Sequence, residues 1–342
     1  MHRPLRLTID RASLVHNWRT LAEHAGVIAG AAIKANAYGL GAREAFDALY
    51  EAGCRDFFVS IWAEAEELGR IPEDAALAVL HGVGPDDVEA AGGLSARPVL
   101  NTVEQVGRWK EVGAGRPCDV MIDTGMNRLG LRPEEVAALH GLAIETLHSH
   151  LACADEDSDL NAAQLARFRE VAAAVAAKRY SLANSAGIYL GRDYSFDLVR
   201  PGLALYGGIP RHEAEGEIRR VVHVEAQVVQ RRTIRAGESC GYGATFEAKE
   251  DTEAAILNVG YADGYLRGFS SKGVVFAGEY ALPVLGRVSM DLIAVGCDVA
   301  KDLREGEWVE IDYDLPTASE AAGLSQYELL TTLGSRFERR WA

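Results

Sequence analysis

A lysine placed directly after an apolar run is the first residue of this sequence that could do chemistry. Lys34 follows the apolar and small residues 27–33 and precedes a small-residue turn, Ala35-Asn36-Ala37-Tyr38-Gly39. This spacing places a primary amine at the carboxyl end of a predicted strand. Burial disfavours an ammonium group, so a buried lysine has a lowered pKa and can act as a nucleophile or form a Schiff base. The alternative is a solvated lysine that only closes a strand.

Two later segments combine hydroxyl, amide and glycine residues, Asn184-Ser185-Ala186-Gly187 and Arg200-Pro201-Gly202-Leu203. Each follows one of the last two predicted strands of an alternating series, where barrels commonly bind phosphate on helix amides. Asn and Ser are also ordinary N-caps, and Gly is an ordinary turn residue. Their joint position on the same rim as Lys34 predicts a site for a phosphorylated aldehyde whose carbonyl lies near the amine.

Other polar residues follow the intermediate strands. Arg128 could grip a carboxylate with two parallel hydrogen bonds, or it could simply pair with Asp123 across the same turn. His148 and His150 are two apart on a predicted strand and therefore share a face. No second ligand cluster accompanies them, so we expect no metal site and instead expect His150 to support a cofactor or a catalytic hydroxyl.

Further along the chain, Tyr242 lies between Gly241 and Gly243, where little can pack against it. A phenol in that setting favours a functional contact over a place in the core. No competing nucleotide signature is present, since the pair Gly39 and Gly41 lacks the third glycine of a dinucleotide fingerprint and there is no P-loop.

Alternating strand and helix patterns position most of these residues. Alternating elements predict a parallel sheet, and eight strands predict a closed (β/α)8 TIM barrel, with an open doubly wound sheet as the alternative. The eight strand patterns are residues 27–33, 56–61, 76–80, 96–100, 118–122, 142–148, 180–183 and 196–199.

After Gly207 and Gly208 the sequence becomes rich in strand patterns separated by glycine-containing turns. These are residues 222–232, 254–259, 273–277, 280–284, 292–295 and 308–313, followed by one helical pattern at 319–333. They predict a second, mostly antiparallel β domain. We expect a barrel domain over residues 10–209 and a C-terminal domain over residues 210–342 that includes an N-terminal strand at 1–9.

The composition narrows the class of protein. With 342 residues, 48% hydrophobic and 25% charged, the chain can bury a large core. A net charge of -15 argues against nucleic acid or an anionic membrane as a partner. Five cysteines without a C-x-x-C pair suit a reducing compartment. The absence of a leader and of any apolar run of about 18 residues predicts a cytoplasmic protein.

Taken in order along nearly the whole chain, these segments resemble the alanine racemases, which are fold-type III pyridoxal-phosphate enzymes. The resemblance implies a homodimer with shared active sites that interconverts L- and D-alanine, a small-molecule substrate, with pyridoxal 5'-phosphate as cofactor. The segments that carry it are residues 33–41, 123–131, 184–187, 199–207, 241–243, 260–264 and 286–291.

The resemblance also implies a role for each matching residue. Lys34 is the Schiff-base lysine and the base on one face of the substrate α-carbon, and the partner subunit's Tyr242 is the base on the opposite face. Arg200 faces the pyridine nitrogen, where an always-charged arginine discourages protonation of the ring. His150 supports the catalytic tyrosine, and Tyr261 belongs to the access passage. Arg128 and the Met290 backbone of the other subunit contact the substrate carboxylate. The phosphate contacts are Tyr38, Asn184, Ser185, Gly202, Leu203 and Tyr327.

One position departs from the family pattern. Many relatives have a lysine, often carbamylated, where this chain has Met121, so Arg128 must be oriented by something else, such as Asn127 or a bound anion. The alternative functions are a serine or broad-specificity racemase, a non-catalytic pyridoxal-phosphate carrier and a decarboxylase. The second domain and Tyr242 argue against the carrier. The sequence leaves open whether the reaction supplies a peptidoglycan precursor or serves the breakdown of D-alanine.

Overall fold

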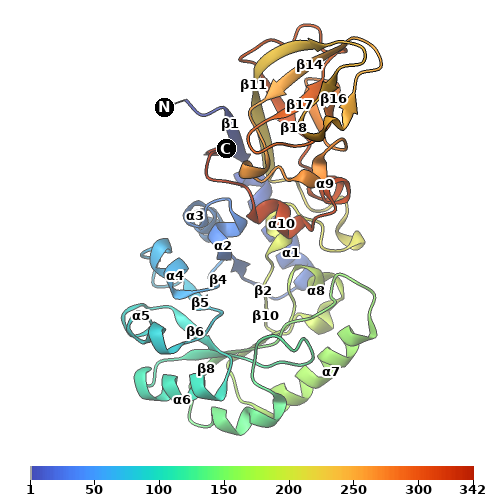
Figure 1. Cartoon of the computed structure of the whole chain (residues 1–342). Coiled ribbons are helices and arrows are strands. Elements are labelled where there is room, and N and C mark those ends of the chain that lie inside the picture. Colours follow the sequence, from blue (N-terminus) through green and yellow to red (C-terminus); the bar gives the residue numbers. More distant parts are fainter. Residues whose placement is uncertain (1) are drawn as a thin grey trace. The chain divides into compact units, whose positions relative to one another are not determined.

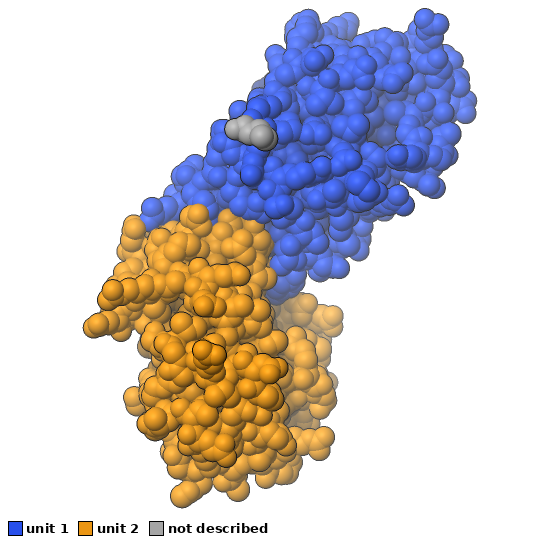
Figure 2. All heavy atoms as spheres, turned by 60° about the vertical axis from the view of Figure 1, so that its left-hand side comes forward, with its two compact units in different colours: residues 1–13, 220–342 blue, residues 14–219 orange. Residues whose placement is uncertain are grey.

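The computed structural model describes residues 2–342, which form two compact units (Figure 2). The barrel unit is Leu14–Arg219, and the β unit combines the segment that ends at Ser13 with Arg220–Ala342. Met1, which the sequence analysis included in an N-terminal strand, lies outside the described residues.

Short parallel strands joined by helices form the barrel unit (Figure 1). Seven strands pair in the order of the chain, and β10 (Leu198–Val199) pairs in parallel with β2 (Ile28–Ala29), directly before β3. Backbone hydrogen bonds from Asp197 to Tyr180 and from Arg200 to Ala183 connect the last two strands. The seven are β3 (Ala31–Ala32), β4 (Asp56–Val59), β5 (Ala76–Val79), β6 (Arg97–Leu100), β7 (Cys118–Met121), β8 (Ile144–His148) and β9 (Arg179–Ser181).

β2 and β3 together make one strand that is interrupted at Gly30, so the ring has the eight strands that the sequence pattern predicted. The barrel prediction is therefore confirmed. Gly30 allows the first strand to run close to the second, because a Cβ there would lie 2.7 Å from the carbonyl oxygen of Asp56. The strands are buried on both faces and consist of near-continuous apolar runs, as parallel strands covered by helices require.

Helices follow most of the barrel strands, and some of these helices begin at a side-chain cap. Thr102 and Ser158 cap two of them by accepting hydrogen bonds from the N–H groups of Gln105 and Leu160. The segment after β7 contains a 3-10 helix, η2 (Pro133–Leu139), in place of an α-helix. The helices of the barrel series are α1 (Arg11–Ala25), α2 (Lys34–Tyr38), α3 (Ala42–Ala52), α4 (Trp62–Leu68), α5 (Val88–Gly93), α6 (Val103–Val112), α7 (Asp159–Ala174) and α8 (Ser185–Tyr189), with 3-10 turns η1 (Pro85–Asp87), η3 (Arg192–Tyr194), η4 (Leu203–Tyr206) and η5 (His212–Ala214).

The main sheet of the β unit has eight strands, and its long strand β11 also pairs with β14, an edge strand of the sheet order. Every pairing is antiparallel except that of β1 with β19. The prediction of a mostly antiparallel second domain is confirmed. The strands are β1 (Leu5–Ile9), β11 (Val222–Ile234), β14 (Thr252–Leu257), β15 (Val274–Ala277), β16 (Tyr280–Leu285), β17 (Ile293–Gly296), β18 (Trp308–Ile311) and β19 (Glu338–Trp341).

Several short elements of the β unit differ from the sequence-based expectation. The single helix predicted at 319–333 is two helices, α9 (Leu315–Ala322) and α10 (Gln326–Thr331). Gly323 ends the first with a φ of 68°, and the Ser325 side chain caps the second. No sequence pattern indicated β19 or the small hairpin of β12 (Ser239–Cys240) and β13 (Phe246–Glu247), which encloses the 3-10 turn η6 (Tyr242–Ala244). Within residues 2–342, no helix is long and apolar enough to cross a membrane.

Candidate active site

Lys34 comes directly after the first barrel strand and begins an unusual turn. The four residues Ala35 to Tyr38 all have left-handed backbone angles, with φ between 52° and 55°. Left-handed helical residues other than glycine cost about 1–2 kcal/mol each. The small-residue turn predicted from the sequence is thus a left-handed turn that needs support from its surroundings.

That support comes from two polar side chains. Glu64 in the first turn of α4 accepts hydrogen bonds from the N–H of Ala35 at 2.7 Å and from the N–H of Ser60 at 2.6 Å. Asn36 accepts from the N–H of Ala42 through its side chain at 2.8 Å. Glu64 therefore holds the turn that begins at Lys34 against the end of the second barrel strand.

Lys34 is half-buried, and its pKa is lowered. Burial is the largest cause, the positive charges of Arg128 and Arg200 act in the same direction, and Glu64 opposes them. A lowered pKa increases the fraction of neutral amine near neutral pH, which is the nucleophilic form. The structure thus gives Lys34 the electrostatic surroundings that a reactive amine requires.

His150 lies near the same cationic side chains. Burial lowers the pKa of its imidazole to about 3, with further contributions from the charges of Arg200, Arg128 and Lys34. His150 is therefore neutral at physiological pH. Three positive or potentially positive side chains surround this neutral ring, so the group favours an anionic ligand.

Arg200 is held rigidly at the end of the eighth strand. Its guanidinium Nη2 donates to the carbonyl oxygen of Ser149 at 2.6 Å, and Nη1 donates to the Ser181 hydroxyl and to His148 Nδ1, the latter at 3.3 Å. Burial lowers the pKa of Arg200 to about 10, and the carboxylate of Asp119 opposes this shift. The Nε–H donates to no acceptor among residues 2–342, so it is the N–H that is available to a ligand.

Behind Arg200, His148 and Asp119 form a buried polar pair. His148 Nε2 lies 3.4 Å from Asp119 Oδ2, and both side chains are inaccessible to solvent. Because His148 Nδ1 accepts from Arg200, the remaining proton of the neutral ring is on Nε2, facing the carboxylate. Burial lowers the pKa of His148 to about 4, so the ring is neutral. The Asp119 carboxylate thus partly offsets the Arg200 charge, and the neutral His148 ring lies between the two.

A narrow cradle joins the residues that the resemblance assigned to phosphate. The buried Ser185 hydroxyl accepts hydrogen bonds from the N–H groups of Gly202 at 2.9 Å and Ala204 at 3.2 Å. A Cβ at Gly202 would lie 2.2 Å from the Tyr38 hydroxyl, so only glycine fits beside that phenol. Asn184 caps α8 by accepting from the Gly187 N–H, which is the structural role that its position also allowed.

The loop that carries Arg128 is organised by Asp123, but not through an ion pair between the two. The Asp123 carboxylate accepts hydrogen bonds from the backbone N–H groups of Gly125, Met126 and Arg128. Among the described residues, Asp123 and Arg128 are therefore connected across this turn through the Arg128 N–H, at 3.1 Å from Asp123 Oδ2, and no ion pair joins their side chains. Arg128 is exposed, and no acceptor among the described residues orients its guanidinium.

Four further predicted residues belong to the β unit. Tyr242 is 69% exposed, Met290 is 53% exposed and Tyr327 is 46% exposed, which is unusual for large apolar or aromatic side chains. Tyr261 begins the 3-10 turn η7 (Tyr261–Asp263), whose backbone contacts residues 289 and 290. The roles predicted for these residues, and for those of the barrel unit, stay predictions.

The donor set fits a phosphorylated aldehyde. The amine nucleophile is Lys34, whose pKa is lowered. Contacts for anions come from two arginines, from a hydroxyl, and from the glycine against which the Tyr38 phenol packs. Among residues 2–342, no three His, Cys, Asp or Glu side chains are grouped so that they could hold a metal ion.

Sequence reasoning missed two contributors to this site. Glu64 sits in the first turn of a helix, which looks like an ordinary position for an acidic residue. Asp119 lies in a predicted apolar run beside the strand of His148, where a charged residue could have been noticed as anomalous.

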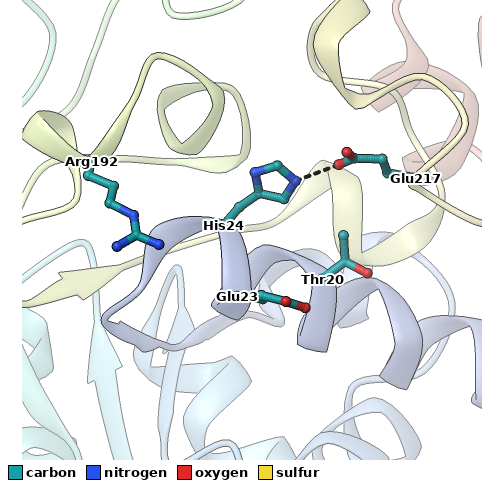
Figure 3. Close-up of a pocket in the computed structure, with 5 residues that line it drawn as sticks. All are labelled: Thr20, Glu23, His24, Arg192 and Glu217. Carbon is teal, nitrogen blue, oxygen red and sulfur yellow. Dashed lines mark hydrogen bonds and ion pairs between the residues drawn. The ribbon is translucent and has the colours of Figure 1, made fainter.

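A separate hollow of about 480 Å³ lies elsewhere on the barrel unit (Figure 3). Its lining residues are Thr20, Glu23, His24, Arg192 and Glu217. The ion pair from His24 Nε2 to Glu217 Oε2 is 2.6 Å long. None of the predicted site residues lines this hollow, and its charges are already partly paired, so it is not the candidate active site.

Comparisons with known proteins agree on one family. Residues 9–210 match the N-terminal domain of alanine racemase, and residues 221–341 match its C-terminal domain. An alanine racemase of Methylobacterium nodulans is 41% identical over 353 residues, which cover 98% of this chain and 95% of that protein. A catabolic alanine racemase of Agrobacterium fabrum is 42% identical over 354 residues, which cover 98% of this chain and 91% of that protein. The crystal structure of an alanine racemase from Bartonella henselae, which has covalently bound pyridoxal phosphate, has a TM-score of 0.94 at 38% identity and covers 100% of both chains.

Proposed function

Because the chain belongs to the alanine racemase family, we propose that it is a pyridoxal-phosphate-dependent isomerase that interconverts L-alanine and D-alanine in a homodimer with shared active sites. The observation that carries the proposal is the half-buried Lys34, whose pKa is lowered by burial and by two arginines. Phosphate and carboxylate groups would balance the positive charge of these side chains.

The residues of the barrel unit would hold the cofactor at three points. Lys34 would bind it covalently. The Ser185 hydroxyl, the Tyr38 phenol, Asn184 and the backbone of Gly202 and Leu203 would hold the phosphate. The Nε–H of Arg200 would face the ring nitrogen, and a permanently charged donor there disfavours protonation of that nitrogen. When bound, this cofactor accepts the electron pair that remains after the α-proton leaves.

Racemisation requires one proton carrier on each face of the α-carbon. Lys34 would exchange the proton on one face, and the partner subunit's Tyr242 would exchange it on the other. The 69% exposure of Tyr242 supports a surface that another subunit covers, because the flanking Gly241 and Gly243 offer it no packing. Neutral His150 would support this phenol. Arg128 and the Met290 N–H of the partner subunit would hold the substrate carboxylate.

A mixed dimer tests the shared site. Lys34→Ala and Tyr242→Phe should each be inactive or severely slowed as homodimers, because each lacks one proton carrier at both sites. When the two variants are co-expressed, a heterodimer should regain about half of the wild-type activity, because one of its two sites contains both carriers. Failure of the purified heterodimer to regain activity would exclude a site shared between subunits.

Two measurements extend the test. In Tyr242→Phe, solvent deuterium incorporation should slow much more for one enantiomer than for the other, and equal slowing would count against two separate bases. Assays with both enantiomers of alanine, serine and larger amino acids address the substrate, since a single methylene or hydroxyl discriminates weakly in an apolar pocket. Turnover of serine equal to that of alanine would replace the proposed substrate by a broader class.

A further inference from the structure

An arginine near the C-terminus connects two turns of the β unit. Arg336 donates from Nε to Asp263 Oδ1 at 2.5 Å and from Nη2 to Asp263 Oδ2 at 2.6 Å. Its third nitrogen, Nη1, donates to Asp291 Oδ1 at 2.7 Å. One guanidinium therefore binds the turn that contains Asp263 and the turn that contains Asp291.

The first of these two anchor points is rigid. Asp263 is fully buried and also accepts a hydrogen bond from the Gly260 N–H at 3.0 Å. The backbone of the same turn is tied to the C-terminal segment, because the Gly334 N–H donates to the Asp263 carbonyl oxygen at 3.0 Å. A buried carboxylate with a bidentate arginine partner has little freedom to rearrange.

The turn around Asp263 also fixes the backbone that precedes Asp291. The N–H of Tyr261 donates to the Ser289 carbonyl oxygen at 3.1 Å, and the N–H of Ala262 donates to the Met290 carbonyl oxygen at 3.0 Å. Gly260 allows this approach, since a Cβ there would lie 2.4 Å from the Met290 carbonyl oxygen.

These contacts determine where one N–H points. In a planar trans peptide the N–H points opposite to the preceding carbonyl. Because Tyr261 holds the Ser289 carbonyl, the Met290 N–H of the same peptide points away from the turn. Within the described part of the chain, that N–H donates to no acceptor, and the Met290 side chain is 53% exposed.

We propose that Arg336 is a positioning residue for the substrate carboxylate: through Asp263 and Asp291 it fixes the peptide plane whose Met290 N–H binds that carboxylate in the neighbouring subunit. This inference rests on the proposed function. Arg336 itself touches neither the substrate nor the cofactor.

The proposal separates binding from chemistry. Loosening the peptide plane weakens one hydrogen bond to a carboxylate, which should raise KM while kcat stays within about twofold, since Lys34 and Tyr242 are unchanged. Asp291→Ala removes one of the three contacts at a half-exposed carboxylate and leaves the buried Asp263 pair intact. We expect about a 5- to 20-fold higher KM for alanine in Asp291→Ala and in Arg336→Met.

Two further variants distinguish geometry from charge. Arg336→Lys keeps the charge but cannot bind two carboxylates in the same plane, so it should resemble Arg336→Met. Arg340→Met is the matched control, because the Arg340 side chain is similarly exposed and forms a surface ion pair with Glu338 at 2.8 Å. It should leave both kinetic constants unchanged.

A spectroscopic measurement reports the amide directly. The holoenzyme labelled with 15N-methionine has only three internal methionine amides, and the signal of Met290 is identified by its loss in Met290→Leu. Acetate, as a carboxylate probe, should shift this signal saturably in the wild type and about fivefold more weakly in Asp291→Ala. Equal acetate affinity, or an unchanged KM in both Asp291→Ala and Arg336→Met, would overturn the proposal. A wild-type protein that fails to racemise alanine would instead refute the proposed function.

Discussion

Adding one methyl group at Gly202 should test the cofactor cradle. The Cβ of Gly202→Ala would lie 2.2 Å from the Tyr38 hydroxyl, 3.0 Å from Tyr38 Cζ and 3.5 Å from the Ala32 Cβ. The hydroxyl would have to retreat by about 1 Å to reach ordinary contact distance. Behind it the ring packs on Tyr206 at 4.8 Å between centroids, and Tyr206 is fully buried.

The cost follows from this lack of space. Overpacking by one methyl group in a tight site costs about 1–3 kcal/mol. If the displaced phenol is a phosphate contact, the loss appears in the affinity for pyridoxal 5'-phosphate. At about 1.4 kcal/mol per tenfold change, the Kd should rise by about 5- to 150-fold.

Equilibrium dialysis of the cofactor against protein stripped of it measures this Kd. Gly107→Ala is the control, because Gly107 lies inside α6 with no atom within 4 Å of a Cβ, and it should gain up to about 1 kcal/mol of stability without a change in Kd. In the double variant Tyr38→Phe/Gly202→Ala the clash with the hydroxyl is gone, so the effect of Gly202→Ala should shrink in a double-mutant cycle. Wild-type affinity in Gly202→Ala, or strictly additive effects in the double variant, would refute the reasoning.

Three other perturbations have a defined direction. Arg128→Met removes a charge that lowers the pKa of Lys34, so the pH midpoint for borohydride-trapped attachment of the cofactor should move to higher pH; an unmoved midpoint would contradict the contribution of Arg128. The pKa of His148 is lowered to about 4, so as pH falls from 6.5 the unfolded chain takes up a proton that the folded chain does not, and stability should fall by about 2 kcal/mol by pH 5. Urea unfolding at pH 6.5 and pH 5 should show this loss of unfolding free energy in the wild type and a smaller loss in His148→Gln. Equal losses in the two proteins would contradict the role of His148. Asp56→Ala leaves the largely buried Arg179 without its bidentate partner, and urea unfolding should show a loss of about 3–5 kcal/mol, whereas a loss below 1 kcal/mol would mean that the pair contributes little.

The order of elements could be read from the sequence because it depends on local patterns. Apolar runs bounded by turn residues mark the eight barrel strands, and the position of Lys34 follows from the end of the first run. The prediction of a single helix at 319–333 failed for a local reason as well. Gly323 and Ser325 carry the signals that divide the C-terminal helix, and they lie inside a stretch whose apolar spacing suggested a single helix.

The sequence named candidate site residues, but it did not indicate the contacts and charges that surround them. The acceptors of Arg200 come from the ends of two other strands, at His148 and Ser149 for β8 and at Ser181 for β9. Asp119 and His148 pair across neighbouring strands inside the barrel. Such neighbours are distant in sequence, so no local pattern reveals that they share one buried charge network.

The sequence by itself determined the presence of two kinds of domain, the order of strands in the barrel and the types of side chain available for chemistry, because hydrophobic period and turn residues act over short distances. Only the tertiary structure decided that Ala35 to Tyr38 adopt a left-handed turn, since alanine has no intrinsic preference for that conformation. Only the tertiary structure likewise decided the pKa of Lys34. The direction of the pKa shift of Lys34 depends on burial and on charges brought from distant segments by closure of the barrel.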